Sequence, residues 1–261
     1  MNDTPIHPDT AAQLENPAYR LASLDPDFLL SKEMRGARFM LEYAKAELAL
    51  ERFRIRSTII VYGSARAIEG DASLMGRFYE EARRFGRIAS ERGGALHAPD
   101  GERHNVIATG GGPGVMEAAN RGARDAGAIT IGFNITLPHE QMPNPYTTPD
   151  LTFRFHYFAM RKMHLAMRAN ALVVFPGGFG TLDELFEILT LVQTGKAPGA
   201  PIVLFDRAYW KSLINFDLLV EYGTISASDL DLFAYADTAE EAWEALTARG
   251  LQAREITGVA T

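Results

Sequence analysis

The chain has 261 residues, of which 47% are hydrophobic and 23% are charged. Lys and Arg number 26 and Asp and Glu number 33, which gives a formal charge of −7. This length can bury a substantial core in one large or two small domains. An acidic chain has no general attraction for nucleic acid or for an anionic membrane, although it can hold a local basic pocket for a small anion. We therefore expect neither a nucleic-acid nor a membrane partner.

The chain contains no cysteine, which excludes disulfides, thiolate nucleophiles and cysteine-ligated metals. Its apolar runs, such as residues 171–175, have the length of a strand and are far too short to span a membrane. The first ten residues are polar and include two prolines, unlike a secretory signal. Together these features predict a soluble, cytoplasmic protein.

The N-terminal part of the chain is predicted to precede the main domain as two segments. Residues 1–24 are rich in Pro, Asp, Asn and Ala without a sustained period, which predicts a flexible tail. Residues 25–56 are predicted to be a helical extension, with one helix over 27–54, because apolar residues recur at helical spacing. This helix carries more apolar surface than one domain needs, so we expect it to contact a neighbouring subunit in a homo-oligomer, a dimer or larger.

After residue 57, short apolar runs alternate with amphipathic segments. Strands are predicted over residues 58–62, 105–108, 128–135, 152–155, 171–175, 201–205 and 232–236. Helices are predicted over 72–92, 113–126, 158–169, 181–194, 208–222 and 238–249. This alternation predicts a Rossmann-like α/β domain over residues 57–261, with a doubly wound parallel sheet flanked by helices. Such sheets bind ligands beyond the carboxyl ends of their strands.

Three of the predicted strands lead into glycine-rich turns, at Gly63-Ser64, at residues 110–114 and at residues 176–181. Glycine lets a ligand approach the backbone, and the amides of the following helix favour an anion such as phosphate. A Walker A loop is absent, because Gly195-Lys196 is not followed by Ser or Thr, and the first turn lacks the dinucleotide fingerprint. The turns therefore indicate a phosphate site of another kind, or else ordinary tight connections.

The turn at residues 176–181 has two interpretations. Thr181 and Glu184 have the Thr-x-x-Glu spacing of a capping box, which would only satisfy helix amides. Alternatively, a phosphate lies on the glycine loop and a carboxylate one turn further lies near the sugar of a nucleotide. The start of this predicted helix carries three acidic residues, Asp183, Glu184 and Glu187, which is a larger number than a cap requires. In the preceding helix, Arg161 and Lys162 form either a solvated face or a clamp for an anion.

Three segments resemble the LOG (Lonely Guy) family: GGGPGVM at 110–116, MRK at 160–162 and PGGFGTLDE at 176–184. Its members are nucleoside 5′-monophosphate phosphoribohydrolases, including cytokinin-activating enzymes, and many were once described as lysine decarboxylases. The resemblance covers about residues 57–250. It implies hydrolysis of AMP or a cytokinin riboside monophosphate to free base and ribose 5-phosphate, without a cofactor. The N-terminal extension resembles a longer bacterial branch, whose members form larger oligomers and often hydrolyse AMP.

The resemblance places the catalytic pair on Arg161 and Glu184. It implies that Glu184 stabilises the positive charge that develops on the sugar and acts on the attacking water, while Arg161 holds the substrate. The substrate-binding positions that it implies are Glu140, Lys162, Gly178, Phe179, Gly180, Thr181 and Thr190. We extend the predicted substrate site to neighbouring positions of the glycine turns and helices: Gly63, Ser64, Gly111, Gly112, Met160, Gly177 and Asp183.

Two other functions remain as alternatives. The same loop could serve a non-catalytic carrier or sensor of a phosphorylated ligand, similar to molybdenum-cofactor carrier proteins. A decarboxylase that uses pyridoxal phosphate is the second, but no lysine is identified for the Schiff base. We expect no metal site, because the six histidines form no cluster with ligand spacing. The sequence leaves the preferred base undetermined.

Overall fold

The computed structural model describes residues 7–96, 101–137, 142–197 and 199–252. The chain divides into two compact units, residues 1–45 and residues 46–261. Within the described residues, no helix combines the length and the apolar character that crossing a membrane requires.

The first unit is built from short helical segments. Helix α1 (Pro8–Glu15) and helix α2 (Pro26–Leu30) are separated by 3₁₀ turns, and helix α3 (Arg35–Arg52) begins in this unit. The prediction of one helix over 27–54 is wrong, because the backbone is extended at Ser31. The Arg38 guanidinium donates hydrogen bonds to the carbonyls of Leu29 and Ser31, at 2.8 and 2.6 Å, and so stabilises the break.

The second unit contains a seven-stranded sheet in which every pairing is parallel. Its strands are β1 (Thr58–Tyr62), β2 (Val106–Thr109), β3 (Ile131–Ile135), β4 (Thr152–Phe155), β5 (Ala169–Val174), β6 (Ile202–Phe205) and β7 (Phe233–Ala236). The strand order β4-β3-β2-β1-β5-β6-β7 confirms the predicted doubly wound sheet. Because the chain runs from β1 to one edge and then returns to β5, the strand order reverses between β1 and β5. This is where such a fold binds its ligands.

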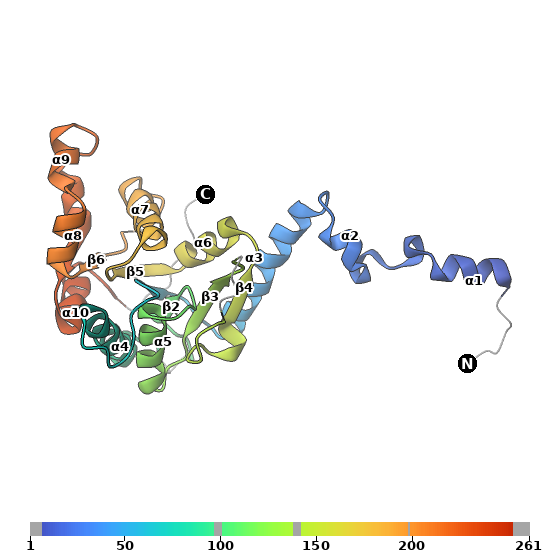
Figure 1. Cartoon of the computed structure of the whole chain (residues 1–261), viewed down its shortest axis with the longest axis horizontal. Coiled ribbons are helices and arrows are strands. Elements are labelled where there is room, and N and C mark those ends of the chain that lie inside the picture. Colours follow the sequence, from blue (N-terminus) through green and yellow to red (C-terminus); the bar gives the residue numbers. More distant parts are fainter. Residues whose placement is uncertain (1–6, 97–100, 138–141, 198, 253–261) are drawn as a thin grey trace. The chain divides into compact units, whose positions relative to one another are not determined.

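Helices cover both faces of the sheet (Figure 1). Helices α4 (Leu74–Arg92), α5 (Val115–Asp125) and α10 (Ala239–Ala248) pack on one face, and α6 (Phe158–Met167), α7 (Phe179–Gln193), α8 (Arg207–Leu213) and α9 (Phe216–Glu221) on the other. Strand β1 alternates between these layers: Ile59 and Val61 contact the first, whereas Ile60 and Tyr62 contact the second. The fully buried strands explain the continuous apolar runs in the sequence.

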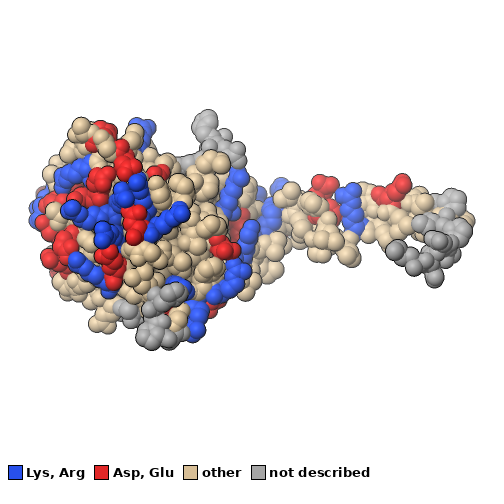
Figure 2. All heavy atoms as spheres, turned by 90° about the horizontal axis from the view of Figure 1, so that it is seen from below, with Lys and Arg blue, Asp and Glu red and all other residues tan. Residues whose placement is uncertain are grey.

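The predicted helix over 208–222 is two helices. Ile214 is extended, and the Asn215 side chain accepts a hydrogen bond from the Leu218 amide, which starts α9. The other predicted elements of this unit are present; β1 and β4 have the predicted bounds, and the remaining elements have shifted ends. On the face shown in Figure 2, basic and acidic side chains are intermingled. Ion pairs such as Arg83 with Asp125 join neighbouring elements.

Candidate active site

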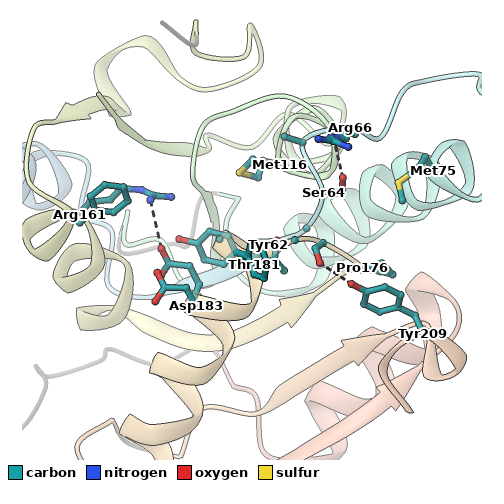
Figure 3. Close-up of a pocket in the computed structure, with 18 residues that line it drawn as sticks. Tyr62, Ser64, Arg66, Met75, Met116, Arg161, Pro176, Thr181, Asp183 and Tyr209 are labelled. Atoms are coloured by element: carbon teal, nitrogen blue, oxygen red, sulfur yellow. Dashed lines mark hydrogen bonds and ion pairs between the residues drawn. The ribbon is translucent and has the colours of Figure 1, made fainter. Parts of the chain in front are cut away.

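A cavity of about 670 Å³ lies at the carboxyl ends of β1 and β5 (Figure 3). One wall is the turn after β1, residues 63–66, and the opposite wall is the loop after β5 with the first turn of α7, residues 176–181. The lining is completed by Tyr62, Met75, Met116, Phe158, Arg161, Asp183, Glu184 and Tyr209. The cavity therefore occupies the position at which the strand order reverses.

The N-terminus of α7 faces this cavity without a side-chain cap. The helix begins at Phe179, two residues earlier than predicted, and Gly178 is its N-cap residue. Thr181 lies inside the first turn, so the interpretation as a capping box is wrong. The amides of Phe179 and Gly180 donate to no acceptor within the described residues. Unpaired amides at the positive end of a helix dipole are well suited to bind an anion.

Arg161 and Glu184 come together on one side of the cavity. The Arg161 Nη1 lies 3.6 Å from the Glu184 Oε1, and the Arg161 Nε donates a 2.8 Å hydrogen bond to the Phe133 carbonyl. A dashed line marks the ion pair that Arg161 forms in Figure 3. Both residues are buried, at 9% and 4% exposure. Burial raises the pKa of the Glu184 carboxyl, and Arg161 and Lys162 lower it only in part.

Lys162 follows Arg161 on α6 but does not line the cavity. Its Nζ lies 2.8 Å from the Asp183 Oδ2 and 2.9 Å from the Glu187 Oε2. Burial opposes the charge of Lys162, but the hydrogen bonds to these carboxylates outweigh it and raise its pKa. Lys162 therefore stays protonated and joins α6 to α7.

The structure brings most of the predicted site residues to the cavity. Those that line it are Gly63, Ser64, Arg161, Gly177, Gly178, Phe179, Gly180, Thr181, Asp183 and Glu184. Met160 packs against the core, and the Thr190 hydroxyl donates to the Phe186 carbonyl further along α7. Glu140 lies outside the described residues.

The second glycine turn lies behind the Arg161 guanidinium. A Cβ on Gly110 would lie 2.8 Å from the Arg161 Nη2, so a larger residue here would displace this side chain. Gly111 has a φ of +68° and its carbonyl accepts a hydrogen bond from the Asn134 side chain. Neither Gly111 nor Gly112 lines the cavity, and Gly110 is the residue of this turn that lies next to Arg161.

Several residues of the site were not predicted. The Tyr209 hydroxyl donates a 2.7 Å hydrogen bond to the Gly177 carbonyl and so holds the loop after β5, but no local pattern in α8 predicts this contact. Arg66 is exposed at the cavity, and its guanidinium has no partner within the described part of the chain. Arg66 could have been predicted, because it is a cationic residue in the first glycine turn. For Tyr62, the last residue of β1, the only signal in the sequence was its position directly before that turn.

The fold and this cavity define a Rossmann-like α/β protein with an uncapped helix N-terminus beside a buried Arg–Glu pair. A family model described as "Possible lysine decarboxylase" matches residues 116–246, half of the chain. The chain belongs to this family, which is the LOG family indicated by its motifs.

Similar proteins include two plant enzymes. The "Cytokinin riboside 5′-monophosphate phosphoribohydrolase LOG3" of Arabidopsis thaliana is 31% identical over 140 residues, 52% of this chain and 64% of that protein. The "Probable cytokinin riboside 5′-monophosphate phosphoribohydrolase LOG4" of Oryza sativa subsp. japonica is 31% identical over 147 residues, 55% of this chain and 62% of that protein. The chain therefore spans less than two thirds of the length of these relatives.

A likeness among solved structures supports the fold. The X-ray structure of TM1055, a structural genomics target, matches with a TM-score of 0.51 at 21% identity, and the match covers 74% of this chain and 99% of that chain. At this identity the likeness shows the fold alone.

Proposed function

We propose that this protein is a nucleoside 5′-monophosphate phosphoribohydrolase, which converts AMP or a related nucleotide into free base and ribose 5-phosphate. The observation that carries the proposal is the buried Arg161–Glu184 pair, which faces the same cavity as the uncapped N-terminus of α7. The names of the plant relatives support the same reaction class.

The 5′-phosphate would lie on the first turn of α7. The unpaired amides of Phe179 and Gly180 offer hydrogen bonds, and the helix dipole favours the negative charge. Arg66, on the opposite wall, supplies a cation that is not already neutralised by a carboxylate of the described chain. This binding energy lies away from the reacting bond and positions the sugar.

The sugar would then lie beside Glu184. Breaking the bond from C1′ to the base leaves positive charge on the sugar ring, which an ionised carboxylate stabilises. Water adds to C1′ as the bond from C1′ to the base breaks, and Glu184 accepts a proton from that water. The departing base takes a proton from the solvent, to which Glu184 then returns its own. The raised pKa of Glu184 makes its carboxylate a stronger base than an exposed glutamate. Arg161 keeps this carboxylate in place.

A decarboxylase based on pyridoxal phosphate is disfavoured by the composition of the cavity. Such an enzyme needs a lysine amine for the Schiff base. The described lining of the cavity contains no lysine, and Lys162 is held by Asp183 and Glu187.

The direct test is to incubate the purified chain with AMP, GMP, CMP, UMP and a cytokinin riboside monophosphate, and to measure free base by chromatography. We expect base and ribose 5-phosphate in equal amounts from at least one monophosphate, with adenosine a poor substrate. Glu184→Gln should abolish release, whereas Glu187→Gln, a matched change on the same helix, should retain it. Binding of AMP without release of base would contradict the proposal and support a carrier.

A further inference from the structure

Tyr62 is a buried polar residue of the cavity to which the proposed reaction assigns no role. It is the last residue of β1, it is 4% exposed, and its ring packs in the core between the sheet and the α6/α7 layer. Its hydroxyl is buried and makes no hydrogen bond within the described residues. A buried hydroxyl without a partner costs stability, so such a group calls for a physical explanation.

The Glu184 carboxylate, in turn, lacks a close hydrogen-bond donor. The Arg161 Nη1 lies 3.6 Å away, beyond ordinary hydrogen-bond length, and no shorter hydrogen bond to this carboxylate is made by the described chain. The charged groups that act on Glu184 are Arg161 and Lys162 of α6 and Asp183 and Glu187 of α7. An unpaired donor and an underpaired acceptor therefore line the same cavity.

The two groups are close enough to interact. In Figure 3 the Tyr62 hydroxyl points to the side of the cavity where Arg161 and Asp183 lie. Burial raises the pKa of Tyr62 well above its ordinary value; the charge of Arg161 opposes this rise, and the charge of the Glu184 carboxylate adds to it. Tyr62 thus stays protonated at neutral pH and can act as a neutral donor.

We propose that Tyr62 is a positioning residue, whose hydroxyl donates a hydrogen bond to the ionised Glu184 carboxylate and holds it toward the sugar. Both groups line the same cavity, and the Tyr62 hydroxyl has no other partner within the described residues to compete for this bond. It stabilises the charged form of a carboxylate that burial otherwise disfavours. The role in turnover rests on the proposed phosphoribohydrolase function, but the hydrogen bond itself does not.

The kinetic test compares Tyr62→Phe with Tyr209→Phe. Each removes one hydroxyl oxygen from the same cavity, but Tyr209 bonds to the Gly177 carbonyl and not to Glu184. We expect Tyr62→Phe to raise the midpoint of the acid limb of kcat/KM by about one pH unit, because a donor to a carboxylate is lost. Its KM should change little. Tyr209→Phe should raise KM and leave the acid limb in place.

A second measurement does not depend on turnover. The ¹³C resonances of the glutamate carboxyls are followed against pH in the wild-type chain and in Tyr62→Phe, with Glu184→Gln to assign the signal. We expect the Glu184 midpoint to be higher in Tyr62→Phe. An unchanged midpoint would overturn the inference. If the wild-type chain releases base from no nucleotide, the proposed function fails, while this titration still decides whether the hydrogen bond exists.

Discussion

Replacing Gly180 by alanine should stabilise the protein and, at the same time, weaken its binding of the nucleotide. Gly180 lies in the first turn of α7, and a Cβ built there meets no atom within 4 Å. Alanine is favoured over glycine in a helix by up to about 1 kcal/mol, and by about half of that near the end. For a chain of this size the melting temperature should rise by roughly 1–3 °C.

The effect on the ligand has the opposite sign. The added methyl projects from the turn that would hold the phosphate, beside an amide that is free of other partners. A hydrogen bond to a charged group contributes about 1.5–3 kcal/mol. Its loss should raise the KM or Kd for AMP by roughly 10- to 100-fold.

The matched control is Gly63→Ala in the opposite wall. A Cβ there would lie 2.7 Å from the Val115 Cγ1 and 2.8 Å from the Phe175 Cβ, and both side chains are fully buried. This crowding should cost about 1–3 kcal/mol of unfolding free energy. Circular dichroism during thermal unfolding measures the stability of each variant. Calorimetric titration with AMP measures its affinity for the nucleotide. If Gly180→Ala bound AMP as tightly as the wild type, the phosphate would not lie on α7.

Three further predictions follow from the charges. Arg161→Ala should lower kcat about 100-fold or more and weaken AMP binding, measured by base release, since Glu184 loses its ion-pair partner; near wild-type turnover would contradict its role. Glu184→Gln should leave the melting temperature at pH 7 unchanged or raised, because a pKa raised by burial means that ionisation of Glu184 opposes folding at neutral pH; clear destabilisation would show that the carboxylate is structural. Glu47→Ala should lower the unfolding free energy by about 2–3 kcal/mol in urea, because the buried Arg168 loses the bidentate partner that it holds at 2.7 and 2.8 Å. The hydrogen bond to Arg168 lowers the pKa of Glu47, so the stabilisation by Glu47 is present above about pH 4.5 and is lost as the pH falls through the lowered pKa. If the difference in unfolding free energy between the wild type and Glu47→Ala did not shrink in acid, this explanation would be contradicted.

The sheet could be predicted because most of its strands are short, largely apolar runs between amphipathic helices, and that pattern is local in the sequence. The start of α7 could not be predicted from the sequence. Thr181 has the residue type of an N-cap, but the helix begins at Phe179 after Gly178, which offers no capping side chain. The missing cap is what leaves amides free at the cavity. The break after α2 depends on the guanidinium of Arg38, which comes from the next helix.

Helix geometry explains which of the predicted site residues reach the cavity. Arg161 and Lys162 are adjacent on α6 and therefore project about 100° apart, so one faces the cavity while the other faces α7. Thr190 lies six residues after Glu184, which places it about 9 Å further along α7. Residues contributed by distant elements, such as Tyr209, had no sequence signal because their positions follow from tertiary packing. The expected homo-oligomer stays a prediction.

The most direct measurement of the central claim is a crystal structure of the Glu184→Gln protein with AMP bound. Our account predicts the phosphate oxygens within hydrogen-bond distance of the Phe179 and Gly180 amides, and the anomeric carbon next to the side chain at position 184. A nucleotide bound elsewhere, or one whose sugar faces away from that side chain, would contradict it.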